Sequence, residues 1–235
     1  ITRNHMKRVF LLVAAAVLSL VVTSCSKYRY EEVADDPLHS RIYTLDNGLK
    51  VYMTVNGEAP RIQTYIAVRV GSKNDPLETT GLAHYFEHLM FKGTKSFGTQ
   101  DYEAERPMLD EIERLFEVYR TTTDADERRA IYARIDSVSQ EASKLAIPNE
   151  YDKLMSAIGA AGTNAFTSYD MTVYTEEIPS NQIDNWAKIQ SDRFANAVIR
   201  GFHTELETVY EEYNMSLTSD SRKMLDSLMV ALYPH

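Results

Sequence analysis

Residues 81–94 read GLAHYFEHLMFKGT, and within them His84 to His88 spell the pattern H-x-x-E-H. On a helix, His84 and His88 are one turn apart on the same face, so both imidazoles can reach one metal ion. Glu87 lies close to the same stripe and can contact a water at that metal without being a ligand. The pattern inverts the zinc-binding helix pattern H-E-x-x-H. The alternative, two ordinary histidines on the surface or in the core, stays open at this point.

Composition sets broad limits on the function. The chain has 235 residues, of which 44% are hydrophobic and 25% are charged, so it can bury a sizeable core in one or two domains. Its net charge of −9 argues against a nucleic-acid binder, which would need a basic face. The single cysteine, Cys25, excludes an internal disulfide bond.

The first 24 residues have the pattern of a secretory signal peptide. Met6, Lys7 and Arg8 give a plausible start and a positive region, so that residues 1–5 lie upstream of the true start. Residues 9–22 are apolar but too short for a comfortable membrane span. Cys25 follows Val-Thr-Ser, which resembles the lipobox of bacterial lipoproteins and implies a lipid on Cys25 and a bacterial envelope location, on the periplasmic or surface face of the outer membrane. A free cysteine behind an ordinary signal or anchor helix is the alternative.

The first half of the remaining chain alternates between strand and helix patterns. Residues 25–40 are polar and acidic and are interpreted as a tether. Strands are predicted at 41–45, 49–55 and 62–70, with a tight turn at Asn47-Gly48 between the first two. Residues 81–91 are predicted to be a helix, capped by Thr79 or Thr80 and closed by Gly93, that buries its apolar stripe on a sheet.

Helical patterns dominate the second half. We expect a helical hairpin at 102–143 with a break at 121–124, a short helix at 150–158, and strands at 163–168 and 171–178. A helix around Trp186 follows, then one that begins with a capping box at Thr204 and Glu207, and a last helical stretch at 223–232. The order of elements predicts an α/β (α+β) fold, a mostly antiparallel sheet with helices packed on it.

A third metal ligand is expected on the helix that starts at Thr204. Glu205 and Glu212 share one face of that helix, about 10.5 Å apart along its axis. One can bind the metal while the other stands two turns away. Spacing alone does not choose between Glu211 and Glu212.

Four segments together resemble the M16 family of zinc metallopeptidases, the pitrilysin, insulysin and mitochondrial-processing-peptidase group. They are the helix at 81–94, the N-A-x-T strand within 162–170, the strand and loop at 62–75, and the E-x-x-x-x-x-x-E helix at 205–212. The resemblance implies that Glu212 joins His84 and His88 as ligands of one Zn²⁺ per chain, with Glu87 as general base. It implies that Glu205 supports catalysis from outside the ligand set, although Leu206 stands where the family usually has arginine.

The same resemblance implies how substrate is held. Asn164, Ala165, Phe166 and Thr167 would bind a peptide as an additional strand. An ordinary sheet strand is the alternative. The interval from His88 to Glu212 is longer than in the family, so the helices at about 102–150 are interpreted as an insertion. Residues 41–235 are interpreted as a partial N-terminal M16 domain that is incomplete at its C-terminus and needs further domains in cis or a partner subunit.

The expected function is therefore zinc-dependent endopeptidase activity on peptides or unfolded polypeptides, at a membrane reached through a lipid anchor and without nucleic acid. Two alternatives are a non-catalytic M16 chamber or partner subunit and a zinc-binding envelope lipoprotein. The motif residues His84, Glu87, His88 and Glu212 are all present, which disfavours the first. A structural zinc site normally has four protein ligands, which disfavours the second.

Overall fold

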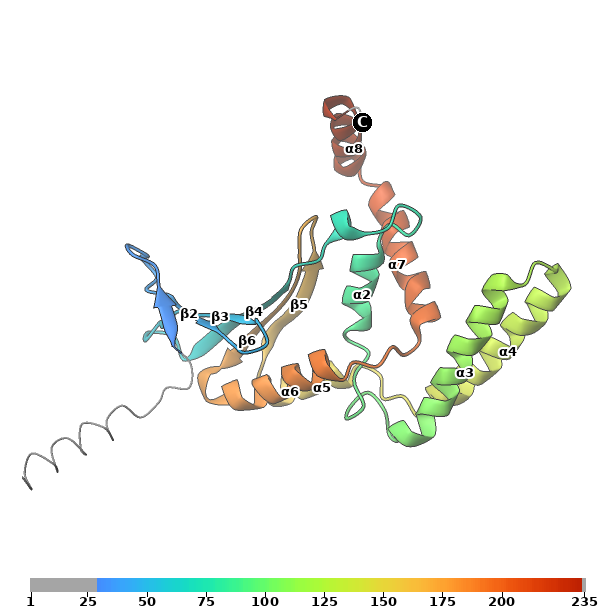
Figure 1. Cartoon of the computed structure of the whole chain (residues 1–235), viewed down its shortest axis with the longest axis horizontal. Helices are drawn as coiled ribbons and strands as arrows, with labels where there is room; N and C mark the ends of the chain where they lie inside the picture. Colours follow the sequence, from blue (N-terminus) through green and yellow to red (C-terminus); the bar gives the residue numbers. More distant parts are fainter. Residues whose placement is uncertain (1–28, 234–235) are drawn as a thin grey trace, which may run out of the picture. The chain divides into compact units, whose positions relative to one another are not determined.

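The computed structural model describes residues 29–233 and divides the chain into two compact units, Ile1–Ala59 and Pro60–His235. Over the described residues the fold is a mixed α/β arrangement of helices α2 to α8 and two antiparallel sheets (Figure 1). The predicted fold class is confirmed. No helix within residues 29–233 is both long enough and apolar enough to cross a membrane.

The first unit contains a three-stranded sheet. Strands β1 (Tyr30–Glu32), β2 (Arg41–Thr44) and β3 (Lys50–Met53) lie in that order and are antiparallel. The turn between β2 and β3 uses Gly48 at φ 85°, a conformation that glycine adopts without strain. The prediction that 25–40 is only a tether is wrong for β1, because the backbone of Tyr30–Glu32 pairs with β2 and so forms a strand despite its polar composition.

The second unit is built on a sheet of strand order β4-β6-β5. Its strands are β4 (Arg61–Val68), β5 (Ala161–Thr167) and β6 (Thr172–Pro179). β6 is central and mostly buried, and β5 lies at an edge, paired on one side with β6. The strands predicted in this unit are confirmed, with boundaries that shift by one or two residues.

Short helices cover this sheet and its connections. They are the 3₁₀ helices η1 (Ser72–Asn74) and η2 (Ser180–Gln182), and the α-helices α2 (Leu82–Leu89), α5 (Glu150–Ala157) and α6 (Ile183–Ala195). The core between them contains Phe97, Tyr151, Met155 and Ile178. Burying such side chains stabilises the unit by about 1.5–3 kcal/mol each.

A buried arginine fixes the end of α2 within this core. The Arg193 side chain is fully buried, and its Nε donates to the carbonyl oxygen of Met90 at 2.9 Å. Its guanidinium lies over the rings of Phe91, Tyr151 and Tyr174, each about 4.4 Å from the ring centroid or nearer. Aromatic faces compensate part of the cost of burying a cation. The helix that carries His84 and His88 is thus held firmly at its C-terminal end.

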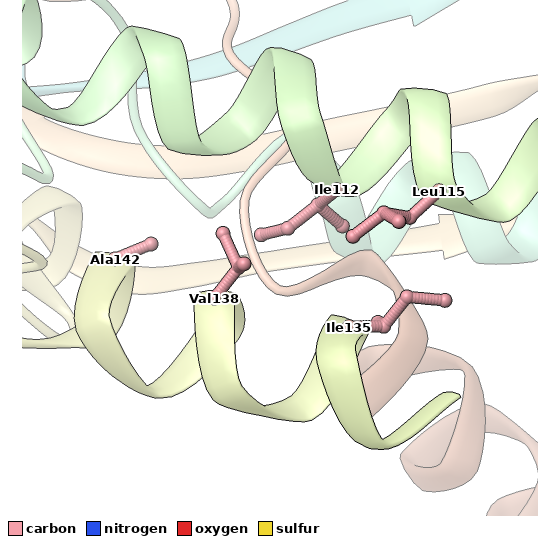
Figure 2. Close-up of a cluster of buried hydrophobic side chains, with 5 residues drawn as sticks. All are labelled: Ile112, Leu115, Ile135, Val138 and Ala142. Carbon is pink, nitrogen blue, oxygen red and sulfur yellow. The ribbon is translucent and has the colours of Figure 1, made fainter. Parts of the chain in front are cut away.

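The predicted helical hairpin is confirmed. Helices α3 (Tyr102–Thr121) and α4 (Ala125–Ser143) lie side by side (Figure 1), and the Asp124 side chain caps α4 at the predicted break. Figure 2 shows Ile112 and Leu115 of α3 facing Ile135, Val138 and Ala142 of α4. The hairpin therefore has a small core of its own, which the partly buried Phe202 also contacts.

Helices α7 (Phe202–Leu217) and α8 (Asp220–Leu232) complete the described chain. The predicted capping box at Thr204 is wrong, because α7 begins two residues earlier and its N-cap is Gly201 at φ 55°. Tertiary contacts explain the earlier start. Phe202 packs on Phe116, with ring centroids 4.9 Å apart, and its carbonyl oxygen accepts a hydrogen bond from the Tyr85 hydroxyl at 2.5 Å.

Candidate metal centre

Helix α2 carries the H-x-x-E-H residues, and a side chain several residues before the helix caps its first turn. Neither Thr79 nor Thr80 caps it; the two Asp75 carboxylate oxygens accept hydrogen bonds from the backbone of Gly81 and Ala83 at 2.8 and 2.9 Å. An acidic side chain at this position also favours the positive end of the helix dipole. Asp75 replaces the two threonines as the cap because its carboxylate reaches two backbone N–H groups at the start of α2.

The face of α2 that is buried also differs from the prediction. Ala83, Glu87 and Leu89 are buried, whereas Phe86 is 47% exposed. The reason is that α2 packs against α7 and β5 (Figure 1), and residues of these two elements line a hollow together with His84, Glu87 and His88. The polar stripe therefore faces a hollow, while the apolar stripe is only partly covered.

Three donor groups converge between α2 and α7. One ligand atom from each of His84, His88 and Glu212 lies within 4.8 Å of the other two. The Nε2 atoms of the two histidines are 3.2 Å apart, and Oε2 of Glu212 lies 3.8 Å from that of His84 and 3.5 Å from that of His88. Glu211 is not among the three donors. Of the two glutamates that sequence spacing left open, the structure therefore brings Glu212 to the two histidines.

The geometry fits a zinc ion. Bonds of about 2.0–2.1 Å in a tetrahedral site place donor atoms about 3.3 Å apart, close to the three separations here. Two imidazoles with one carboxylate form a known catalytic zinc set, which leaves a fourth position for water or substrate. Among residues 29–233, the group brought together at this point has three donors and no fourth. A closed structural site would require one more.

Glu205 holds the His88 ring from outside the donor set. Its Oε1 lies 2.8 Å from Nδ1 of His88, so Nδ1 carries the proton and Nε2 faces Glu212 as an acceptor. Its other oxygen forms an ion pair with Nζ of Lys92. Burial alone would raise the pKa of Glu205, but the hydrogen bonds from Lys92 and His88 outweigh it and lower that pKa below its ordinary value.

Glu87 is buried beside the donors and is held by β5. The Thr167 hydroxyl donates a hydrogen bond to Oε2 of Glu87 at 2.5 Å. Thr167 also lies 3.2 Å from the hydroxyl of Thr172, which donates to the carbonyl oxygen of Val70. An ionised carboxylate only accepts hydrogen bonds, so the Thr167 hydroxyl is the donor in its contact with Glu87. The sequence predicted a substrate-binding role for Thr167 and missed this contact.

The hollow around these groups has a volume of about 460 Å³. Its lining residues come from α2 and the turn that follows it, α5, β5 and α7: His84, Glu87, His88, Phe91, Lys92, Asp152, Thr163, Asn164, Ala165, Glu205 and Glu212. Of the four residues predicted to bind substrate, Asn164 and Ala165 therefore line it. Phe166 is 51% exposed outside this lining, and Thr167 reaches it through Glu87. Cys25, the predicted lipidation site, lies outside the described residues.

Comparison with known proteins finds relatives that are similar in sequence and in fold. The model of the insulinase family, peptidase family M16, matches residues 50–113, a span that contains α2. Protease 3 of Escherichia coli is 30% identical to this chain. The match covers 48% of this chain and 10% of the length of Protease 3. The crystal structure of pitrilysin superimposes with a TM-score of 0.52 at 18% identity, over 83% of this chain and 16% of that one.

A further structure has a similar fold. The first half of the periplasmic protease PqqL from Escherichia coli superimposes with a TM-score of 0.51 at 19% identity, over 85% of this chain and 34% of that one. The chain is similar to the N-terminal part of M16 family metallopeptidases, which these matches support together. It spans about a tenth of the length of the curated relatives it matches.

Proposed function

We propose that this chain carries the catalytic centre of a zinc-dependent endopeptidase that hydrolyses peptides or unfolded polypeptides. The observation that carries the proposal is the convergence of three donors from His84, His88 and Glu212 beside the buried carboxylate of Glu87. The relatives that the chain resembles are proteases, which supports a peptidase rather than another use of the metal.

His84, His88 and Glu212 would hold one Zn²⁺. When bound, zinc polarises a peptide carbonyl and lowers the pKa of water toward about 7. Glu205 orients the His88 imidazole through Nδ1 and keeps Nε2 available as a ligand atom. These three ligands and their partner come from α2 and α7, two helices that pack directly on each other.

Glu87 acts as the general base. Thr167 holds one of its oxygens, and the other takes the proton from the attacking water and passes it to the leaving amine. Positioned acid–base groups contribute about 10²–10⁴-fold to rate. The burial of Glu87 keeps bulk water away from this transfer and strengthens its electrostatic effect.

The β5 edge binds the substrate. β5 pairs with β6 on one side, and within residues 29–233 no strand pairs with its other side. An extended peptide can add to this edge through backbone hydrogen bonds, which tolerate many sequences. Asn164 and Ala165 would lie closest to the reacting bond because they line the same hollow as the donors, with Phe166 and Thr167 continuing the strand.

The proposal also covers the location of the protein and the domains that complete it. We infer an envelope location with a lipid on Cys25, supported by its Val-Thr-Ser context and by a fold shared with a protease described as periplasmic. A Cys25→Ser variant should lose lipid labelling; labelling of the serine variant would contradict the anchor.

We also infer that the hairpin at 102–150 is an insertion into the M16 domain, and that further M16 domains, in cis or in a partner subunit, complete the chamber.

The experiment that tests the function combines zinc content with peptide hydrolysis by a protein that contains this chain. About one zinc per chain is expected, with hydrolysis that a chelator removes and added zinc restores. Glu87→Gln should retain the zinc and lose turnover by at least about 10²-fold. Hydrolysis by Glu87→Gln at the wild-type rate would contradict the mechanism. Zinc binding without any hydrolysis by the wild type would instead favour a non-catalytic M16 subunit or a zinc-binding lipoprotein.

A further inference from the structure

The carboxylate of Glu205 is shared between two partners. One oxygen bonds Nδ1 of His88 at 2.8 Å, and the other forms an ion pair with Nζ of Lys92. We propose that Lys92 is a positioning residue of the metal centre, whose ammonium fixes the Glu205 carboxylate and, through it, the His88 ring. The inference rests on the proposed zinc site and names a group that determines how well this site is held.

Burial explains why Glu205 needs a cation. Its side chain is 13% exposed, and a carboxylate taken out of water is costly unless both oxygens find partners. His88 supplies a single N–H to one oxygen. Lys92 supplies the charge that the other oxygen requires, and together they prevent the carboxylate from rotating about its terminal bond. A rotated carboxylate would no longer hold the His88 imidazole in the plane that directs Nε2 at Glu212.

The backbone of Lys92 is itself anchored. The buried Arg200 donates from Nη1 to the Lys92 carbonyl oxygen at 3.3 Å and from Nη2 to that of Thr94 at 2.6 Å. Its Nε bonds both oxygens of the buried Glu105 at 2.8 and 2.9 Å. Gly93 follows at φ 103°, where a Cβ would come within 2.5 Å of a backbone oxygen.

This anchoring decides the strength of the ion pair. An exposed lysine on a mobile segment loses side-chain entropy when it pairs, which cancels most of the gain. Lys92 starts from a fixed backbone position, four residues beyond His88, and reaches a carboxylate that is largely buried. Contacts therefore run without interruption from Glu105 on α3, through Arg200 and Lys92, to Glu205 and His88.

The test measures zinc affinity of the full chain by competition with a chromophoric chelator. Lys92→Met should raise the Kd for zinc about tenfold, the low end of the range for groups that orient a metal ligand. Lys92→Arg keeps the charge and should recover most of the affinity. Lys95→Met is the matched control, because Lys95 lies over the Tyr102 ring and not on Glu205, and it should bind zinc like the wild type.

A double-mutant cycle separates positioning from a merely structural role. If Lys92 acts through Glu205, Lys92→Met should cause no further loss of affinity in a Glu205→Gln background. Unchanged affinity in Lys92→Met, or an undiminished loss in the Glu205→Gln background, would overturn the inference while leaving the zinc site intact. A wild-type chain that binds no zinc would overturn both this inference and the proposed function.

Discussion

Thr167 donates a hydrogen bond of 2.5 Å to Glu87, which joins the edge strand of the sheet to the helix that carries the metal ligands. Thr167, on the strand that we propose binds substrate, and Glu87, the proposed general base, are therefore in direct contact. A peptide bound along β5 and the general base on α2 would keep a fixed relation to each other. Such coupling matters because misplacement by about 1 Å can cost 10²-fold in rate.

Thr167→Val should lower kcat about tenfold, because it removes a hydrogen bond to a charged group that is worth about 1.5–3 kcal/mol. Zinc affinity should not change, since Thr167 contacts no metal ligand. Steady-state peptide hydrolysis and chelator competition measure the two effects. Thr163→Val is the control: it makes the same change on the same strand, in the lining of the same hollow. A kcat of Thr167→Val equal to that of the wild type would show that Glu87 does not depend on Thr167.

Glu212→Gln should weaken zinc binding by more than about a hundredfold, since losing a direct ligand exceeds the loss of an outer partner. Glu211→Gln should bind zinc normally, because Glu211 is exposed and is not among the converging donors. Metal content after dialysis distinguishes them. The opposite pattern, with zinc lost only from the Glu211 variant, would mean that α7 presents a different face to α2.

Asp75→Ala should cost about 0.5–2 kcal/mol of unfolding free energy through the loss of a helix cap, and should also weaken zinc binding. The second effect follows because the cap ends at Ala83, directly before His84. Asp124→Ala removes a comparable cap from α4, where the carboxylate accepts bonds from Asp126 and Glu127. It should reduce stability without changing zinc affinity, and urea titration with chelator competition measures both quantities.

Val138→Ala should destabilise the protein by about 1.5–2 kcal/mol, because it deletes two buried methyl groups from the core of the α3–α4 hairpin (Figure 2). Val118→Ala makes the same change at a position that is 38% exposed, and its effect should stay within about 0.5 kcal/mol. Urea unfolding of both variants checks the difference. Equal losses would indicate that the hairpin does not pack as the structure has it.

Local patterns predicted most of the elements. The Asn47-Gly48 turn, the strands around it and the hairpin helices depend on interactions within a few residues, which a sequence displays directly. Long-range contacts account for the errors. β1 forms because a neighbouring strand supplies partners, and α7 starts at Phe202 because Phe116 and Tyr85 contact that residue. Neither contact has a local signal.

The candidate site divides in the same way. Residue type and helical spacing alone determined that His84 and His88 share a face and that Glu87 lies beside them, because one turn of a helix fixes these relations. Only the tertiary structure brought Glu212 rather than Glu211 to the histidines and placed Thr167 on Glu87 and Lys92 on Glu205. The physical reason is that packing sets the rotation of one helix against another to within a fraction of a turn, and no local pattern encodes that angle.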